Sequence, residues 1–253
     1  RYILRLKPLD PLEQELGAAD RGNALHKALQ DFMKAHPSGV LPEGAVKEFE
    51  GLGEHHLAAL LAAPAERAFW WPRFQRLAGW LVDIENARRA TGARVLDTEC
   101  DGSLTVGPAG KTLVIEARAD RVDALDAGTW EVIDYKTGRA PSVDELEALF
   151  SPQLLLEAAM AERGGFARIP GRAGSVRLSY WQANGLDDGG KIVPIKDSDR
   201  LVARMIDMAE KMAAHYATAG TAYPALPWPE YGPYFNDYAH LERVAEWAVA
   251  GDE

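Results

Sequence analysis

Two carboxylates and one lysine lie close together in the sequence, in a pattern that could hold a metal ion beside a water molecule. Asp134 and Lys136 belong to the segment IDYKTG (residues 133–138), and Asp120 precedes them in ADRVD (119–123). Hard cations such as Mg²⁺ prefer oxygen ligands, and a bound cation lowers the pKa of water and offsets charge on phosphate oxygens. A nearby lysine can orient that water or stabilise developing charge. These residues therefore predict metal-dependent hydrolysis of phosphodiester bonds.

The two segments read as the strands of one β-hairpin. Strands expected at 112–120 and 130–136 flank the turn residues 126–128. Centring the turn on Ala127 places Asp120 opposite Asp134, and strand alternation puts Lys136 on the same face. The other face is apolar and is expected to pack against helices; it carries Leu113, Ile115, Ala117, Ala119, Ile133 and Tyr135. The alternative is a solvated sheet face whose charges are purely structural.

Hydrophobic periodicity predicts one mixed α/β domain around this hairpin. Further strands are expected at 94–100, 103–106 and 175–182, with turns at 101–102 and 107–108. Helices are expected at about 20–34, 43–91 with breaks at Pro64 and Pro72, 143–163, 199–218 and 240–249. The tryptophans of the second helical stretch are interpreted as core residues, with stacking against DNA as the alternative.

Composition restricts the class of protein without naming it. The chain has 253 residues, a net charge of -10 and one cysteine, Cys100, which cannot form an internal disulfide or hold an iron–sulfur cluster alone. The negative charge argues against a general nucleic-acid coat, but a metal can offset carboxylates locally in a nuclease. No apolar run is long enough for a transmembrane helix. Because the chain opens on Arg1, we expect it to be a piece of a longer protein.

The motifs in combination resemble the PD-(D/E)XK nuclease module of the RecB type. The resemblance rests on ADRVD, IDYKTG, the helix segment QLLL (153–156) and the upstream segment RGNALH (21–26). It implies a restriction-endonuclease-like mixed β-sheet flanked by helices. One nuclease domain would then span 1–253, with a helical insertion at about 37–92 and a C-terminal helical extension at about 199–250.

The resemblance also implies roles for individual residues. His26, Asp120 and Asp134 would bind a divalent metal, Mg²⁺ with Mn²⁺ able to substitute. Lys136 would be the catalytic lysine, acting with Asp134 and Asp120, and Gln153 would help to place water or DNA. Many relatives have a tyrosine four residues after this glutamine, where this chain has Glu157.

The ends of the chain resemble the C-terminal nuclease domain of AddB-type subunits of bacterial helicase–nucleases. The segments at 4–12 and 238–244 carry this likeness. It implies cleavage of DNA, at single-stranded ends, in double-strand-break repair beside a helicase–nuclease partner subunit, in the cytoplasm at the nucleoid. No Walker A pattern occurs, so the motor would lie elsewhere. Alternatives are a stand-alone single-strand nuclease and a non-catalytic DNA-binding or scaffolding module.

Two further interpretations concern aromatic side chains. Relatives that fasten their ends with an iron–sulfur cluster use four cysteines; here packing of aromatic residues could do the same, namely Trp228, Tyr231, Tyr234 and Phe235. His55 and His56 are adjacent and point about 100° apart on a helix, so they are interpreted as surface residues rather than a chelate. His36, His215 and His240 lack a companion pattern.

Overall fold

The computed structural model describes residues 17–186 and 188–223. The chain divides into a compact unit, residues 16–214, and a second unit made of 1–15 and 215–253. The first unit carries the predicted hairpin and is described below. The single domain over 1–253 stays a prediction. The expected helix at 240–249, the two end segments and the aromatic residues from Trp228 onward lie outside the described residues.

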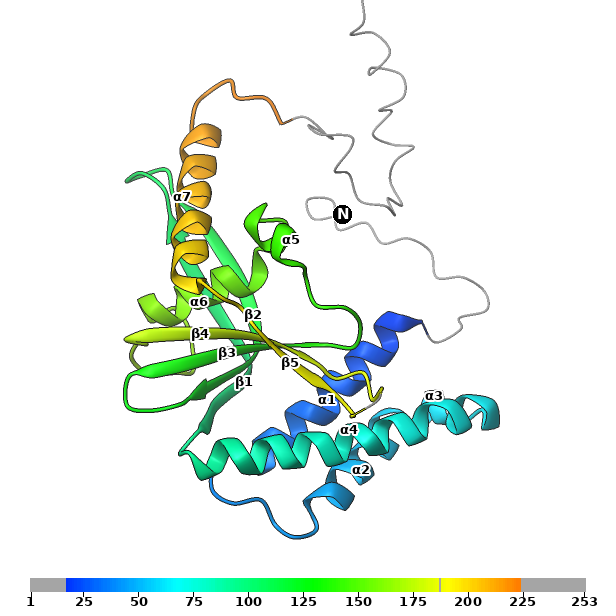
Figure 1. The fold of residues 1–253 in the computed structure, drawn as a ribbon. Helices are drawn as coiled ribbons and strands as arrows, with labels where there is room; N and C mark the ends of the chain where they lie inside the picture. The colour runs from blue at the N-terminus through cyan, green and yellow to red at the C-terminus, as the bar shows by residue number, and fades with distance from the viewer. Residues whose placement is uncertain (1–16, 187, 224–253) are drawn as a thin grey trace, which may run out of the picture. The chain divides into compact units, whose positions relative to one another are not determined.

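The core of this unit is a five-stranded mixed sheet (Figure 1). The strands follow their chain order across it: β1 (Arg94–Val106), β2 (Leu113–Ala124), β3 (Thr129–Lys136), β4 (Ser175–Gln182) and β5 (Lys191–Pro194). β3 and β4 pair in parallel, and all other neighbours are antiparallel. A parallel pair needs a crossover connection, which here contains two helices, α5 (Val143–Glu147) and α6 (Gln153–Arg163).

Helices cover both faces of the sheet. One buried cluster joins strand residues to α6 and to α7 (Ser198–Tyr216). The other joins them to α1 (Ala18–Ala35), α2 (Ala45–His56), α3 (Ala58–Leu61) and α4 (Pro64–Ala90). In Figure 1 the two groups lie on opposite sides of the strands. The expectation of a mixed sheet core flanked by helices, with added helices after α1, is confirmed.

The predicted hairpin register is confirmed, but its apolar face is not a single face. Arg121 pairs with Ile133 and Ala124 with Trp130, as the turn centre at Ala127 requires. Ile115 and Ala117 pack with the α6 side, however, whereas Ile133 and Tyr135 pack with the α1 and α4 side. The expectation was wrong because it extended one alternation over the whole hairpin, whereas β2 pairs with β3 only over its last four residues.

Several element boundaries also differ from expectation. The 101–102 segment is not a turn: β1 runs through it, and a Cβ at Gly102 would lie 2.8 Å from Met160 Sδ and from Phe166 Cδ1. Glycine is used there for a close approach of helix and strand. The expected helix at 143–163 is two helices separated by a bend before Pro152. α4 continues through Pro72, because Phe74, Leu77 and Leu81 anchor it in the core.

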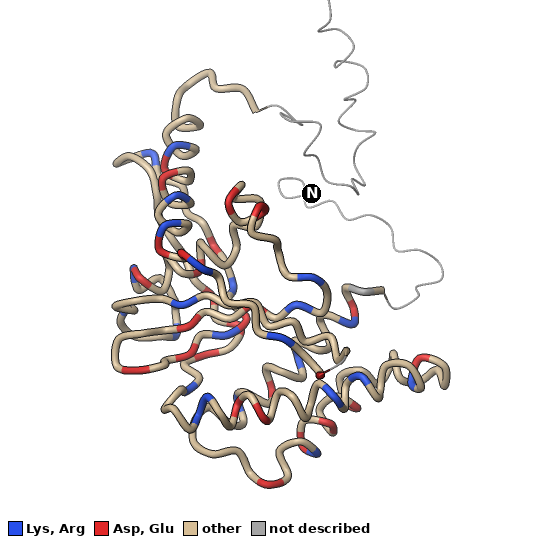
Figure 2. The backbone as a smooth tube through the Cα atoms, in the orientation of Figure 1, with Lys and Arg blue, Asp and Glu red and all other residues tan. Residues whose placement is uncertain are grey.

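A network of buried charges lies between α4 and the sheet. Arg121, which is 1% exposed, forms ion pairs with Asp123 and Glu85 at 2.7 Å. Arg88 joins Asp123 to Glu131 through bonds of 2.6 Å. Arg121 therefore pairs with a carboxylate two residues further along its own strand. Elsewhere Figure 2 shows acidic and basic residues interspersed along the elements, so the net negative charge is not gathered in one region of the described chain.

Candidate active site

Asp120 lies where β2 and β3 separate. The paired residues of the two strands end at Arg121 and Ile133, one position before Asp120 and Asp134 would meet. Asp120 Oδ2 instead accepts a hydrogen bond of 2.8 Å from the Tyr135 backbone N–H. The carboxylate replaces the missing ladder partner, which leaves Oδ1 free to turn toward α1.

His26 reaches Asp120 from α1. Its Nδ1 lies 3.4 Å from Asp120 Oδ1, and its Nε2 lies 3.1 Å from the Tyr135 carbonyl oxygen. A carbonyl only accepts, so Nε2 carries a proton and Nδ1 faces the carboxylate. Histidines that bind metals commonly hold their second nitrogen in this way. Burial lowers the pKa of His26, but the hydrogen bond and charge of Asp120, with Asp134 and Glu99, outweigh it and raise that pKa.

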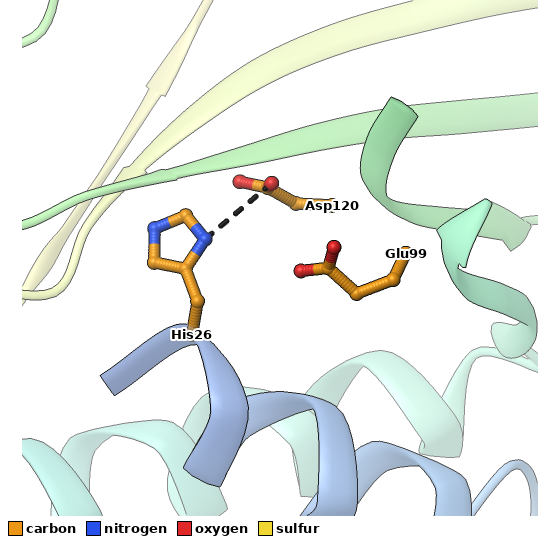
Figure 3. A group of neighbouring side chains, drawn as sticks. All are labelled: His26, Glu99 and Asp120. Atoms are coloured by element: carbon orange, nitrogen blue, oxygen red, sulfur yellow. Dashed lines mark ion pairs between the residues drawn. The ribbon is translucent and has the colours of Figure 1, made fainter. Parts of the chain in front are cut away.

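Glu99, which the sequence interpretation missed, completes a group of possible metal ligands with His26 and Asp120. One ligand atom each from His26, Glu99 and Asp120 lie within 4.8 Å of one another, and Figure 3 shows their side chains converging. Glu99 lies in the left-handed region with φ 48°, two residues after a register shift in β1 that falls between Val95 and Asp97. Burial and the charge of Asp120 raise its pKa. The β1–β2 register would have located it, since the flanking pairs are Thr98 with Arg121 and Cys100 with Ala119.

Asp134 and Lys136 form a second pair near the end of β3. Lys136 Nζ lies 2.7 Å from Asp134 Oδ2, and the Asp134 side chain is only 3% exposed. Burial and the charge of Asp120 raise the pKa of Asp134 to about 6, although Lys136 and His26 oppose the shift. Asp134 is therefore electrostatically coupled to the His26, Glu99 and Asp120 group, but it is not one of the three residues within 4.8 Å.

Gln153 begins α6 and faces the same cavity as the lysine pair. This cavity, of about 410 Å³, is lined by Asp134, Lys136, Gln153 and Tyr180 among others. Gln153 Nε2 donates to Glu157 Oε1 at 3.0 Å. Burial raises the pKa of Glu157 to about 8 against the bond from Gln153, and its Oε2 has no hydrogen-bond partner among the described residues. Glu157 is thus a neutral acid at pH 7 that holds the glutamine.

The predicted site residues therefore converge from α1, β2, β3 and α6. Two other histidines within the described residues have carboxylate partners away from this site. His36 pairs with Glu48 and His56 with Asp31, at 2.9 and 2.8 Å. His55 is exposed, as interpreted, and His56 is half-buried where it pairs with Asp31.

Comparison with known proteins gives the family. Residues 1–230 match the family described as the PD-(D/E)XK nuclease superfamily. The chain belongs to this superfamily. Its mixed sheet between helices is accordingly a restriction-endonuclease-like fold, as expected.

Several individual proteins are also similar to this PD-(D/E)XK domain. An uncharacterized protein of Rickettsia bellii is 26% identical over 166 residues, and one of Rickettsia conorii is 28% identical over 173 residues. Each match covers 66% of this chain, which spans only 20% of the length of either relative. A structure titled "Crystal structure of SSO0001" has 17% identity over 76% of this chain and 85% of that one, with a TM-score of 0.28.

Proposed function

We propose that this PD-(D/E)XK domain is a divalent-metal-dependent DNA nuclease, with Mg²⁺ as the cation and Mn²⁺ able to substitute. The observation that carries the proposal is the geometry of His26, whose Nε2 is held by the Tyr135 carbonyl while Nδ1 faces Asp120. That arrangement presents an imidazole nitrogen and a carboxylate oxygen toward one point. Burial and the charge of Asp120 raise the pKa values of Glu99 and Asp134, and a cation beside these carboxylates would offset the repulsion from Asp120.

The proposed roles follow from these positions. His26, Asp120 and Asp134 would hold the metal, with Glu99 as an additional ligand. A bound divalent cation would lower the pKa of water and offset charge on the scissile phosphate. Lys136, ion-paired with Asp134 and one-third exposed, is placed to orient or deprotonate that water and to stabilise developing charge. Gln153, held by Glu157, would position water or the DNA strand at the same cavity.

The biological setting is part of the proposal. Because the chain spans a fifth of its curated relatives, we propose that it works as one domain of a longer protein. The AddB-type resemblance supports processing of broken DNA ends during recombinational repair, beside a helicase–nuclease partner subunit in the bacterial cytoplasm. Within the described residues, no helix is long and apolar enough to cross a membrane.

The test is cleavage of a labelled single-stranded oligonucleotide by the purified chain with Mg²⁺ or Mn²⁺. Activity should disappear with EDTA and fall at least a hundredfold in Lys136→Ala, as for other positioned proton-transfer groups. The matched control is Lys211→Ala, which removes a lysine paired with Asp207 on the exposed side of α7. Cleavage that survives Lys136→Ala would refute the site. A wild type that binds DNA without cutting it would instead favour the scaffolding alternative.

A further inference from the structure

A second cavity, of about 290 Å³, borders the two residues that follow β3. Its lining is mainly apolar and comes from α1, α3, α4 and Leu57, which lies between α2 and α3; the other aliphatic and aromatic side chains include Leu25, Leu60, Phe74 and Leu77. Arg21, Trp70 and Arg73 also line it, together with Thr137 and Gly138 after β3. An apolar cavity with a few polar groups is the usual form of a small-ligand site.

Two residues that line the cavity are direct sequence neighbours of candidate active-site residues. Leu25 lines the cavity and the next residue of α1 is His26, while Thr137 lines it directly after Lys136. Arg21 precedes His26 by five residues, or about 7.5 Å along a helix axis. A ligand in the cavity would therefore lie within a short distance of a phosphate at the metal group.

Positive charge and aromatic rings come together where α4 borders the cavity. The Arg73 guanidinium lies 3.9 Å from the Phe69 ring centre and 5.1 Å from that of Trp70, and Arg21 lies 4.8 Å from Trp70. Trp70 is fixed by a 2.8 Å hydrogen bond to Glu66. Over the described part of the chain, no carboxylate forms an ion pair with Arg73. This border is suited to an anionic ligand that also has an apolar ring.

We infer that this cavity receives one unpaired nucleobase of the DNA strand whose phosphate lies at the candidate metal group; the inference rests on the proposed function. A nucleobase has apolar faces for the floor of the cavity, and the backbone phosphates on either side of it carry the negative charge that matches the arginines. A base inside a duplex is stacked and paired, so it must leave the stack to enter. The cavity thus selects single-stranded or frayed DNA. It also gives a role to the aromatic residues of α4 beyond packing.

The test compares two fluorescent strands of equal length, one normal and one with abasic sugars throughout, by anisotropy in EDTA. Both strands keep every phosphate, so their difference reports the bases. Leu60→Trp, which fills the floor of the cavity, should weaken binding of the normal strand about tenfold and leave the abasic strand unchanged. Leu60→Met keeps the volume and is the matched control. Equal weakening of both strands, or no weakening, would overturn the inference.

A second variant avoids dependence on a core substitution. Arg73→Ala should weaken binding of the normal strand about fivefold more than Arg67→Ala. Arg67 lies on the same helix, pairs with Glu54 and does not line the cavity. Equal effects of these two variants would overturn the inference. Failure of the proposed function would give a different result. Base-dependent binding without any metal-dependent cleavage would refute the nuclease but support the base-binding cavity. Metal-dependent cleavage with base-independent binding would support the nuclease but refute the cavity.

Discussion

Asp120 bridges two elements through its two carboxylate oxygens. Oδ2 accepts the Tyr135 backbone N–H at 2.8 Å, and Oδ1 lies 3.4 Å from His26 Nδ1. The Tyr135 carbonyl in turn lies 3.1 Å from His26 Nε2. One peptide segment of β3 therefore orients both side chains, so their relative position does not depend on a flexible loop.

Asp120→Asn should weaken Mn²⁺ binding at least tenfold in titration calorimetry, because the ligand loses its charge. An asparagine carbonyl can still accept the Tyr135 N–H, so the fold should be retained. Asp207→Asn makes the same chemical change on the exposed side of α7 and should leave the affinity unchanged. An Asp120→Asn protein that binds Mn²⁺ as tightly as the wild type would remove Asp120 from the ligand set.

The Glu99→Gln variant tests whether Glu99 is a ligand of the cation. If Glu99 binds the cation, Mn²⁺ affinity should fall by roughly tenfold, because the site loses a charged oxygen ligand. If it does not, the variant should relieve repulsion with Asp120 and raise the melting temperature of the metal-free protein without changing affinity. Glu116→Gln on exposed β2 is the control. We expect the first result.

Glu157→Gln should stabilise the metal-free protein increasingly as pH rises. The pKa of Glu157 is about 8 in the folded chain, above its ordinary 4.5, so the folded state binds the extra proton. Wild-type stability therefore falls between these pH values, whereas a glutamine does not titrate. Urea unfolding in EDTA should show a gain of about 4 kcal/mol at pH 8 that vanishes near pH 4.5. Glu210→Gln, on the exposed side of α7, should show no such trend, and a constant gain would contradict burial of a protonated acid.

Glu85→Ala should lower the free energy of unfolding by about 3–5 kcal/mol, because it leaves Arg121 and Arg89 buried without a shared carboxylate. Chemical denaturation measures the loss. Asp83→Ala, at an exposed position of the same helix, should change stability by no more than about 0.5 kcal/mol. A small effect at Glu85 would mean that water or rearranged side chains satisfy the network.

Local patterns predicted strands better than they predicted helix ends. β4 has the predicted bounds, because its β-branched and aromatic residues lie between clear breaks. The four-residue β5 was missed because a short edge strand carries little periodicity. The crossover was predicted as one helix because the prediction passed over Pro152, which disfavours helical backbone at the preceding residue and stands at the N-terminal cap of α6. Pro72 shows the opposite error, since the break expected there is absent and its helix is held by packing.

The candidate site was predictable where residues are related by a simple turn. Centring one turn on Ala127 located Asp134 near Asp120, and applying the same reasoning to the turn after Gly107 would have added Glu99. Contacts between distant segments were of another kind: His26 and Gln153 came from a family resemblance, and no spacing rule relates them to β3. From the sequence, Glu157 was noticed only because many relatives have a tyrosine at its position. Its hydrogen bond to Gln153 forms only in the folded helix.

Asp120 and Arg121 are consecutive, yet one belongs to the proposed chemistry and the other to the buried charge network under α4. One peptide bond joins the two residues, so a shift of the Arg121 backbone also moves Asp120. Variants of α4 can therefore alter catalysis without touching a ligand. In evolution, we expect this stretch of β2 and its partners on α4 to change together or not at all.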